Sequence, residues 1–516
     1  SPERRVIDQF CTRRWPRLSL PPSLPISAQS LLFPALADMA DILKPDLCII
    51  GAGAAGIALA IAARDAGAAV VLIDTGLAGD SLASGPVPAA ALAASAAHAH
   101  AVRNASAFGM ANGDPKPNFR AVNEHVQAVI AAIASRDAAV RLMALGIELL
   151  AVPAEFIDRR TLKAGETLIR ARRFVIATGS RPLLPAVENL AEVPYFTGDT
   201  IFANPVKLSH LVVFGGSAEG VQLAQAYRRL GCEVTVIAGG AALAEVDPEL
   251  AEIALRRLRE EGVTIHEQTT ADEVVPRNQG IGVIIRHADG QEATLDASHI
   301  LVAVGRVPEL AGLGLDKAGV RLDKAAPERL LLRPRLVTSN RRIHAIGEVA
   351  GSPPTLPAAQ HDARVVLESA LFGRAIKTPA GAVPKLVFTD PQIAQIGLSE
   401  AEARRRFKAG YSVIRASFAE TARAIATRRT YGAAKLITDR HGTILGAALV
   451  GPEAGELITL FGLAIAKAIK LPDLADLVLP EPGFSDIVAQ LVQAWQQQAG
   501  PQPSRQRRLA LVRRLP

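Results

Sequence analysis

Three glycines near the start of the chain have the spacing that most clearly indicates chemistry. Gly51, Gly53 and Gly56 form a G-x-G-x-x-G motif between an apolar run and a helix-like segment. In this motif one glycine makes a tight turn, one lets a pyrophosphate approach the backbone, and one lets the helix lie close to the strand. Asp74 lies 23 positions after Gly51, at the end of a second apolar run, where its carboxylate can accept hydrogen bonds from an adenosine ribose. The stretch therefore predicts a dinucleotide site on a βαβ unit.

The helix of this unit is expected to begin near Ala54 and Ala55, so that its unpaired N–H groups and positive dipole end face the pyrophosphate. A transmembrane helix is the alternative, because residues 48–63 carry no charge. The three glycines, followed by Arg64 and Asp65, argue against a continuous apolar span of about 20 residues. We therefore expect no transmembrane segment here.

A second stretch, residues 210–240, repeats this design. Gly215 and Gly220 take the first and third glycine positions, with Gly216 and Ser217 between them. Ala238 again lies 23 positions after the first glycine. Equal spacing in two βαβ units indicates an internal repeat.

Three further apolar strands end in turns that contain glycine. The turns hold Thr178, Gly179 and Ser180 after the first strand, Gly305 after the second, and Gly347 with Glu348 after the third. Such turns present backbone groups to a nucleotide bound at the carboxyl ends of the strands. These strands, with the helices expected between them, predict an α/β fold.

The charge of the chain is concentrated at its two ends. The net charge is +7 and the pI about 9.5. Residues 1–38 carry +2 and residues 497–516 carry +5, which leaves the remainder neutral. A basic groove for nucleic acid in the folded body is therefore not expected. The three cysteines, Cys11, Cys48 and Cys232, have neither C-x-x-C nor zinc-ligand spacing. This usage fits a reducing compartment, and we predict a cytoplasmic protein.

The two ends of the chain show no pattern of a packed core. Residues 1–38 contain several prolines without periodicity, and we expect a disordered leader. Thr12, Arg13 and Arg14 are similar to part of a twin-arginine export signal, but the prolines that follow argue against export. Residues 498–516 are expected to be a basic, solvated tail, with weak contact to an anionic membrane surface as the alternative.

Hydrophobic periodicity predicts the remaining elements. Helices are expected at about 85–108, 120–144 and 357–372, and short strands at about 147–158, at 166–170 and within 263–297. From Pro384 to about residue 497, alternating strands and two helices predict a separate α+β domain.

Five motifs stand out along the chain: GAGAAG, RRFVIATGS, TSNRRIHAIGE, VFTDPQIAQIGLSEAEA and VGPEAGELI. Over residues 39–497 they resemble those of the pyridine nucleotide-disulfide oxidoreductases, in particular the dihydrolipoamide dehydrogenase and mercuric reductase branch. The resemblance implies an α/β fold of two nested Rossmann-like domains with a C-terminal α+β dimerisation domain. It also implies an oxidoreductase with FAD on the first unit, NADH or NADPH on the second, and a homodimer formed through the third domain.

On this resemblance we predict three domains. The FAD-binding domain comprises residues 39–195 and 326–382, the NAD(P)-binding domain residues 196–325, and the dimerisation domain residues 383–497.

The resemblance also implies particular contacts with FAD. Asp74 is expected to bind the adenosine ribose. Glu348 is expected to bind the ribityl chain, although it stands where the family usually has Asp, so the hydrogen bond is expected to persist but move. Ala154 is expected either to contact the adenine through its backbone or to be a plain strand residue.

The chain departs from the family at the residues that carry electrons from flavin. The family has a cysteine pair in a pattern similar to G-x-C-L-N-x-G-C-x-P-S-K. Here Ser81 and Pro86 occupy the two cysteine positions, and Ala90 replaces the lysine that lies near the flavin. A hydroxyl has a pKa far above that of a thiol, and proline has no nucleophile, so neither forms a thiolate or a disulfide. Gly85 and Pro88 match the pattern, so the backbone path is expected to persist without its relay.

The base that the family uses on the dithiol is also replaced. It is a His in a run similar to H-P-x-x-S-E, contributed by the partner subunit. Here Glu481 stands at the His position and Asp486 at the position of its carboxylate partner. The two are candidates for an acid/base pair, and a surface or interface pair is the alternative. No terminal Cys-Cys is present, which excludes mercury reduction of the usual kind.

The second nucleotide site is altered as well. Ser217 replaces the middle glycine, Glu219 adds a negative charge beside the phosphate loop, and Gln222 stands where the family usually has a Glu near the nicotinamide. Residues 238–240 supply neither the ribose-binding acid expected for NAD nor an Arg for a 2′-phosphate. We expect NAD(P)H to bind, with no basis for choosing between NADH and NADPH.

We predict no metal site. His98 and His100 are two positions apart on a helix and do not share a face. His361 would lie near the flavin by its family position, or be a partly exposed helix residue.

Three functions remain open on the sequence. The first is a FAD-dependent NAD(P)H oxidoreductase in which reduced flavin passes electrons directly to a small-molecule acceptor. The second is a catalytically idle flavin-binding protein retained for structure or interaction. The third is genuine dihydrolipoamide dehydrogenase activity, which the lost cysteines argue against.

Overall fold

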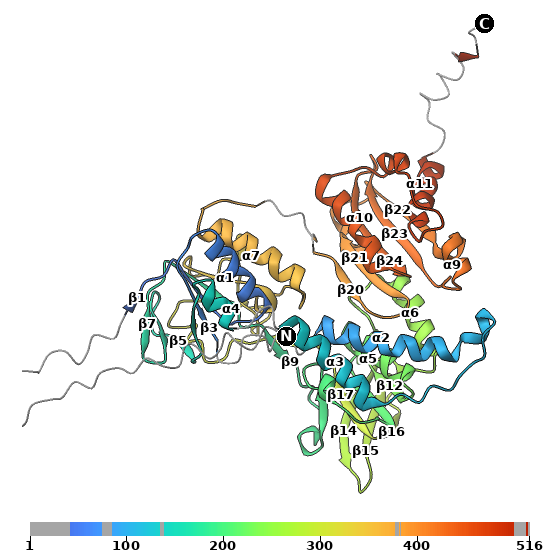
Figure 1. Ribbon diagram of the computed structural model, residues 1–516, viewed down its shortest axis with the longest axis horizontal. Coiled ribbons are helices and arrows are strands. Elements are labelled where there is room, and N and C mark those ends of the chain that lie inside the picture. The colour runs from blue at the N-terminus through green and yellow to red at the C-terminus, as the bar shows by residue number, and fades with distance from the viewer. Residues whose placement is uncertain are drawn as a thin grey trace, which may run out of the picture. The chain divides into compact units, whose positions relative to one another are not determined.

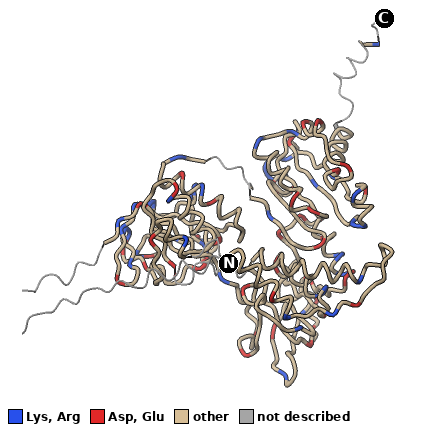
Figure 2. The backbone as a smooth tube through the Cα atoms, in the orientation of Figure 1, with Lys and Arg blue, Asp and Glu red and all other residues tan. Residues whose placement is uncertain are grey.

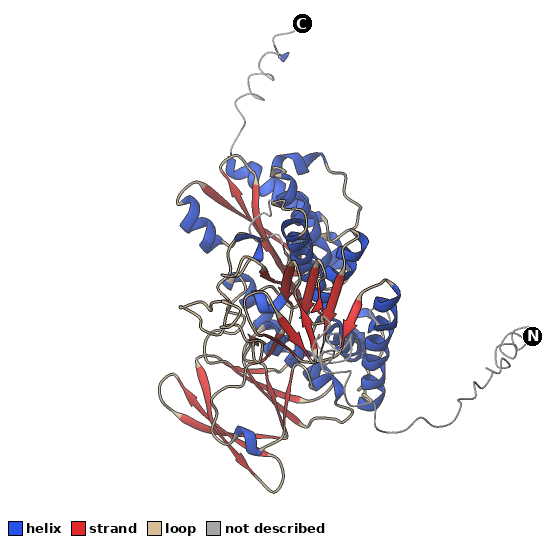
Figure 3. Cartoon of the chain, turned by 90° about the vertical axis from the view of Figure 1, so that its left-hand side faces the viewer, coloured by secondary structure: helices blue, strands red, loops and turns tan. Residues whose placement is uncertain are grey.

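The computed structural model describes residues 42–74, 85–134, 139–376, 381, 383–499 and 512–513. These residues form two parallel sheets and one antiparallel sheet of five strands each, with several smaller sheets (Figure 1). Figure 3 shows the strands in red and the helices that flank them in blue. The predicted α/β fold with a C-terminal α+β part is confirmed.

The first parallel sheet joins strands that lie far apart in the sequence. Its order is β19 (Ile343–Ala345), β8 (Arg173–Ile176), β2 (Leu47–Ile50), β3 (Val70–Ile73) and β4 (Glu148–Leu150). Strands β2 and β3 are buried along their whole length, as expected where helices cover both faces of a parallel sheet. Helix α1 (Ala54–Asp65) follows β2 and packs against α7 (Leu356–Ala370) (Figure 1).

The second parallel sheet repeats this plan. Its order is β10 (Tyr195–Thr197), β17 (His299–Val302), β11 (His210–Phe214), β12 (Glu233–Ile237) and β13 (Thr264–His266). Helix α5 (Ala218–Arg229) follows β11, and α6 (Pro248–Glu260) follows β12. Strands β14 (Thr269–Pro276), β15 (Ile281–His287) and β16 (Glu292–Ala297) form an antiparallel sheet where short strands are predicted.

Short strands complete these two units. Strand β1 spans Ile42–Leu43, and β5 (Ala154–Phe156), β6 (Leu162–Ala164) and β7 (Thr167–Ile169) form an antiparallel sheet. Strand β9 (Ser180–Pro182) pairs with β18 (Arg306–Pro308). This pair joins the chain just beyond the first sheet to the chain just beyond the second.

Helix α2 (Pro86–Arg103) packs against both α3 (Phe119–Ala134) and α5. The helix predicted at about 85–108 ends at Arg103, and residues 105–108 form a 3₁₀ turn that stops at Gly109 in the left-handed conformation. The helix predicted at about 120–144 is described as α3 and α4 (Ala139–Ala144), with residues 135–138 outside the described part.

The C-terminal sheet has the order β20 (Lys385–Val387), β21 (Gln392–Gly397), β24 (Ile444–Gly451), β23 (Ala433–Asp439) and β22 (Tyr411–Ser417), all antiparallel. Its core is built with α10 (Ala454–Lys467) and α11 (Asp486–Ala499). Two further helices, α8 (Glu400–Phe407) and α9 (Ala422–Ala426), exceed the two predicted in this stretch. The charged sequence of α8 has little apolar periodicity, and a Ser399–Glu402 capping box begins it instead.

Charged residues are interspersed along the described chain (Figure 2), in keeping with the neutral net charge of its body. None of the described helices has the length and apolar character needed to cross a membrane. The expectations for residues 1–38 and for most of the tail at 498–516 lie outside the described residues.

Candidate dinucleotide sites

The first glycine loop connects β2 to α1 in a geometry that requires glycine. Gly51 has φ +110°, and a Cβ there would lie well under 3.0 Å from the carbonyl oxygen of Ala177 at the end of β8. A Cβ on Gly56 would likewise clash with the carbonyl oxygen of Gly51. Gly53 precedes α1 with extended backbone (φ −73°, ψ 179°). The loop therefore packs tightly against the end of β8. The first backbone N–H groups, beginning at Ala54, lie at the start of the helix, where they have no partner within the helix.

The other residues proposed for FAD follow the strands of the same sheet. Asp74 follows β3 directly, and its N–H donates to the carbonyl of Leu150 at 2.9 Å. Ala55, at the start of α1, lies so close to Gly347 that a Cβ on that glycine would be 3.0 Å from its Cβ. Ala154 begins β5 opposite Ala164 and is half-buried. The carboxyl ends of parallel strands are where α/β proteins bind ligands.

Glu348, Gly179 and Ser180 meet around Arg306, the residue after Gly305. Arg306 Nε donates to Ser180 Oγ at 2.7 Å, and its Nη2 donates to the Ser180 carbonyl at 2.9 Å. Glu348 Oε1 lies 3.5 Å from Arg306 Nε. Burial raises the pKa of Glu348, while Arg306 and Ser180 act against that rise. The sequence motifs did not single out Arg306, although its place directly after a strand-end glycine is a usable signal.

Thr178 and Gly305 fix the backbone beside this arginine. Thr178 Oγ1 donates to the carbonyl of Glu309 at 2.6 Å, and the N–H of Glu309 donates to the carbonyl of Gly179 at 3.1 Å. Gly305 has φ +137°, and its carbonyl accepts from the N–H of Leu183 at 2.9 Å. The turns after β8 and β17, which the sequence predicts separately, are therefore joined.

Two more carboxylates of the second unit interact with Arg306, one through a hydrogen bond and one through its charge. Its Nη1 donates to Asp199 Oδ1 at 2.7 Å. Glu219, the second residue of α5, has its carboxylate against Gly198, where a side chain of any size would clash with it. Burial raises the pKa of Glu219; Arg306 opposes this, and Asp199 and Glu348 add to it. Glu219 therefore packs against Gly198 and interacts with the charges of the group around Arg306.

A buried acid supports the turn that carries Glu348. Asp362 on α7 accepts from the N–H of Gly347 at 2.9 Å and from Ser352 Oγ at 2.6 Å. Burial raises the pKa of Asp362, and these two hydrogen bonds act against it. Asp362 lies on the buried face of α7, next to the half-buried His361. Only its hydrogen bonds to Gly347 and Ser352 show that it supports this turn.

The second glycine loop has the same backbone shape as the first. Gly215 has φ +115°, and a Cβ there would clash with the carbonyl oxygen of Ala303 at the end of β17, as a Cβ on Gly220 would with that of Gly215. Ser217 Oγ donates to the carbonyl of Ala303 at 2.7 Å and accepts from the N–H of Gly220 at 3.2 Å. Its hydroxyl therefore caps α5 and points into the protein. Gly216 packs directly against Ala242.

The end of β12 carries no charge toward this loop. Ala238 is buried, and its N–H donates to the carbonyl of His266 at 2.8 Å. Gly239 and Gly240 follow, so the backbone alone lies where a nucleotide ribose is bound in dinucleotide folds of this kind.

Gln222 and Ala90 line one cavity of about 330 Å³ between α2, α5 and the loop after β20. The side-chain oxygen of Gln222 accepts from the backbone N–H of Phe388 at 3.2 Å. Gln222 therefore contacts the C-terminal domain, and Ala90, which lines the same cavity, has no side chain beyond Cβ.

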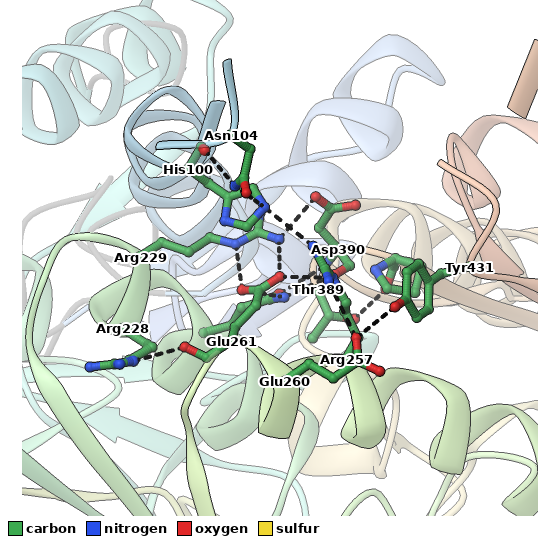
Figure 4. A network of polar contacts seen from close by, with 12 residues as sticks. His100, Asn104, Arg228, Arg229, Arg257, Glu260, Glu261, Thr389, Asp390 and Tyr431 are labelled. Atoms are coloured by element: carbon green, nitrogen blue, oxygen red, sulfur yellow. Dashed lines mark hydrogen bonds and ion pairs between the residues drawn. The ribbon is translucent and has the colours of Figure 1, made fainter. Parts of the chain in front are cut away.

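Buried polar residues fix α5 to the loop between β20 and β21 (Figure 4). Arg229 donates from Nε and Nη2 to the two carboxylate oxygens of Glu261 at 2.7 and 2.6 Å. Its Nη2 also reaches Asp390 Oδ2 at 3.0 Å. Gln225 exchanges two hydrogen bonds with the backbone of Asp390, at 2.9 and 2.8 Å. Although burial acts to raise it, the pKa of Asp390 lies below its ordinary value because Arg229 and Arg429 favour the charged form.

The histidines of α2 point to different partners. His98 Nδ1 lies 2.8 Å from the carbonyl of Ala94. His100 Nε2 lies 3.3 Å from Arg257 Nη2, at the edge of the network in Figure 4. Burial lowers the pKa of His100, and Arg229 lowers it further. No group of three or more metal-ligating side chains occurs among the described residues.

Pro86, which the sequence motif predicts at one of the two family cysteine positions, is the first residue of α2. Ser81, at the other, lies outside the described residues. Cys48 in β2 and Cys232 before β12 are both free and fully buried. Burial raises the pKa of each thiol, that of Cys232 to about 11.

Glu481 and Asp486 are both near the start of α11. Asp486 is its first residue, and its N–H donates to the carbonyl of Gly483 at 3.3 Å. Glu481 is exposed in the preceding loop. In this part of the described chain no hydrogen bond joins the two side chains.

The fold and both loops agree with a known family. A model described as pyridine nucleotide-disulphide oxidoreductase matches residues 45–363, and the dimerisation-domain model of the same name matches residues 383–492. The chain therefore belongs to the pyridine nucleotide-disulphide oxidoreductase family.

Similar proteins include two kinds of enzyme. A mercuric reductase from Streptomyces lividans is 32% identical over 438 residues, which cover 83% of this chain and 92% of the relative. A dihydrolipoyl dehydrogenase from Thermus scotoductus is 31% identical over 467 residues, which cover 88% and 98%. The solved structure of HOCl-induced flavoprotein disulfide reductase RclA from Escherichia coli has a TM-score of 0.75 at 23% identity. It covers 87% of this chain and 100% of its own, and supports the fold.

Family membership confirms the predicted class of enzyme, a FAD-dependent pyridine nucleotide oxidoreductase. It likewise confirms the expected cofactors, FAD and NAD(P)H, as those of the family. The matched dimerisation domain agrees with the expected homodimer.

Proposed function

We propose that this protein is a FAD-dependent NAD(P)H oxidoreductase that passes electrons from the flavin directly to a small acceptor, without a dithiol relay. Bound FAD would supply the two-electron chemistry, accepting a hydride from NAD(P)H and giving electrons to the acceptor. The chain's own residues would bind and orient the two nucleotides and leave the flavin without a sulfur partner.

The observation that carries this proposal is the proline at the N-terminus of α2. Pro86 stands at the second family cysteine position, and proline suits the first helical position because an N–H there has no partner in the helix. It offers no sulfur to receive electrons. The two described cysteines are buried in separate units, Cys48 in β2 and Cys232 just before β12, so they do not form a pair with each other.

A second change supports the same reading. On the family pattern, Ala90 replaces a lysine near the flavin and Gln222 replaces a glutamate near the nicotinamide, and both residues line one cavity. Both ionisable groups are therefore replaced together, by residues that are neutral at every pH. The loss is consistent with a site that no longer has a thiolate to stabilise.

The residues proposed to hold FAD fit that cofactor. The loop around Gly51 and Gly56 leaves no room for side chains, and extended backbone at Gly53 leads into a helix whose first turn has no acidic residue. An anion is therefore favoured there by the helix dipole and the free N–H groups. We propose that Asp74 binds the ribose and Glu348 the ribityl hydroxyls.

We also propose the remaining contacts and the assembly on the family pattern. FAD would be held in addition by Ala54, Ala55, Ala154, Thr178, Gly179, Ser180 and Gly347. NAD(P)H would be held by Gly215, Gly216, Ser217, Gly220, Gln222 and Gly305. The domain limits are those predicted above, and the active form is a homodimer through residues 383–497.

An anaerobic titration of the purified holoprotein tests the absence of a relay. NADH and NADPH are added in separate experiments while the flavin absorption is followed, with dithionite as the control for full reduction. We expect bleaching after uptake of about two electrons, because a flavin alone holds two. Uptake of about four electrons, with a long-wavelength charge-transfer band, or brisk turnover of lipoamide, would contradict the proposal.

A flavin-binding protein without turnover is the second candidate function. The observation that favours it is the absence of any ribose-binding acid or arginine at residues 238–240, together with the extra carboxylate of Glu219. A yellow protein that dithionite bleaches and neither NADH nor NADPH bleaches would support this second function and exclude the first.

A further inference from the structure

The N-terminus of α5 already holds a negative group that belongs to the chain itself. Ala218, the first residue of α5, donates its N–H to Glu245 Oε1 at 3.1 Å. This N–H directly follows the second glycine loop, where free amide groups are available to a dinucleotide pyrophosphate. The corresponding end of α1 has no side-chain hydrogen bond at its N-cap.

The backbone around Glu245 lies directly on the glycine loop. The N–H of Leu243 donates to the carbonyl of Gly216 at 2.7 Å. Ala242 packs so closely that a Cβ on Gly216 would be 2.8 Å from its Cα. Leu243 is 1% exposed and has φ +55°, a conformation that costs free energy for a non-glycine residue and is here held by packing. The segment therefore has a defined position over the loop.

The C-terminal domain holds the same segment from the other side. Gln395 Nε2 donates to the carbonyl of Glu245 at 3.4 Å, and the N–H of Asp247 donates to Gln395 Oε1 at 3.0 Å. Asp247 also forms a buried ion pair with Lys435 at 2.8 Å. The backbone of Glu245 is thus fixed, while its side chain is exposed and free to rotate away.

We propose that Glu245 sets the affinity of the second site, because its carboxylate competes with the pyrophosphate of NAD(P)H for the N–H of Ala218. The inference rests on the proposed binding of NAD(P)H to this loop. A bound nucleotide must displace the carboxylate and then tolerate its charge nearby. Removing that charge is expected to strengthen nucleotide binding about tenfold, the scale of charge effects at partly exposed helix ends.

Binding of the oxidised nucleotides measures this effect apart from catalysis. The dissociation constants of NAD⁺ and NADP⁺ are determined by calorimetry on the FAD-loaded, full-length protein. Glu245→Gln keeps an acceptor for Ala218 but removes the charge, and Glu245→Ala removes both. Glu233→Gln is the matched control, because Glu233 is an exposed acid at the opposite end of β12 whose side chain forms no hydrogen bond or ion pair in the described structure.

The proposal expects a lower dissociation constant for at least one nucleotide in Glu245→Ala, with the control unchanged. A similar decrease in Glu245→Gln identifies charge as the main obstacle, and a decrease in Glu245→Ala alone identifies the hydrogen bond. Unchanged or weaker binding in both Glu245 variants, or an equal change in the control, would overturn it.

The two proposals fail in different ways. If the wild-type flavin is bleached by NAD(P)H but both Glu245 variants bind nucleotide as the wild type does, only the inference about Glu245 fails. If no nucleotide binds to the wild type or to either variant, the second loop is not a nucleotide site and both proposals fall.

Discussion

The two glycine loops have nearly the same backbone and very different surroundings. Gly51 and Gly215 both have positive φ, +110° and +115°, and each lies against a carbonyl at the end of a neighbouring strand. In the first unit the helix has no acidic residue in its first turn, and Asp74 directly follows β3. In the second unit the helix end carries Glu219 and receives Glu245, and β12 ends in Ala238 without an acid.

The helices that follow these loops differ in the same way. Helix α1 is rich in alanine and packs against α7 in an apolar core. Helix α5 buries Gln225 and Arg229 and is bound through them to the C-terminal domain. The comparison teaches that glycine spacing determines the shape of such a loop. The side chains at its mouth, and the partners of its helix, determine what the loop can bind.

Alanine at the first glycine of each loop gives the largest expected effect. Gly51→Ala and Gly215→Ala each place a Cβ against a backbone carbonyl at positive φ, a cost of roughly 2–6 kcal/mol from strain and overpacking. We expect Gly51→Ala to be isolated without flavin. Gly215→Ala should retain flavin but no longer be bleached by NAD(P)H. Flavin content and anaerobic bleaching measure the two outcomes.

Alanine at a third glycine tests the effect of backbone strain at positive φ without a steric clash of the added Cβ. Gly290 has φ +84°, and no described atom lies within 4 Å of a Cβ built there, so Gly290→Ala should cost only about 1–2 kcal/mol and leave both functions intact. Loss of flavin in Gly215→Ala as severe as in Gly51→Ala would contradict the assignment of separate nucleotides to the two loops.

Loss of the arginine at the end of α5 is expected to destabilise the protein next most strongly. Arg229→Met removes the bidentate partner of the buried Glu261 carboxylate and one partner of Asp390, and breaking a buried ion pair typically costs about 3–5 kcal/mol. Glu261 keeps Arg257 Nε at 3.2 Å and Gln225 Nε2 at 3.3 Å, so the lower end of that range is expected. The stabilisation from Asp390 is present above its unfolded pKa and is lost as pH falls through its lowered folded pKa. The difference in the free energy of unfolding between the variant and the wild type should therefore become smaller at acidic pH. Urea unfolding at several pH values measures it.

Arg64 near the end of α1 is the matched control. Among the described residues it donates only to backbone carbonyls, those of Leu145 and Ala68, so Arg64→Met should cost only about 1 kcal/mol with little dependence on pH. Equal destabilisation by the two substitutions would show that α5 is no more dependent than α1 on buried charge.

The features that could be predicted from the sequence are those with short-range signals. Glycine spacing, apolar runs and the acid after β3 are local, and they correctly predict the two βαβ units. Arg306 and Ser180 are 126 residues apart in the sequence, and no local pattern indicates that they form a hydrogen bond. The contact of Glu245 with Ala218 depends on how the segment after β12 folds back over the loop. Its position requires the packing of Leu243 and the hydrogen bonds of Gln395.

Removal of the arginine shared by the two units should have a smaller, pH-dependent effect. Burial already raises the pKa of Glu219 and of Glu348, and Arg306 opposes both shifts. A carboxyl group with a raised folded pKa contributes stability at low pH that is lost as pH rises through that pKa. Arg306→Gln raises both values further, so its destabilisation should grow with pH, to about 1–2 kcal/mol near neutrality.

Thermal unfolding of the FAD-loaded protein from about pH 5 to about pH 8 follows this dependence across the range where raised carboxyl pKa values titrate. Arg306→Lys keeps the positive charge and should reduce the pH dependence, although it loses the two bonds to Ser180. Destabilisation that is constant across pH would mean that Arg306 acts through packing, and would remove the electrostatic link between the two units.

The smallest expected effect concerns the thiols, one of which lies in each unit. Cys48 and Cys232 are fully buried, and burial raises the pKa of both, so neither forms the thiolate that reacts with alkylating agents. Iodoacetamide should therefore leave activity unchanged, both before and after reduction by NAD(P)H. Cys11→Ser removes the cysteine outside the described residues, and this variant should behave identically.

A dithiol enzyme differs because reduction opens its disulfide and exposes a reactive thiolate. Inactivation only after reduction, with alkylation at Cys48 or Cys232, would mean that one unit has a working thiol. The thiol relay would then use a cysteine at another position, and the proline at residue 86 would not indicate that the relay is absent.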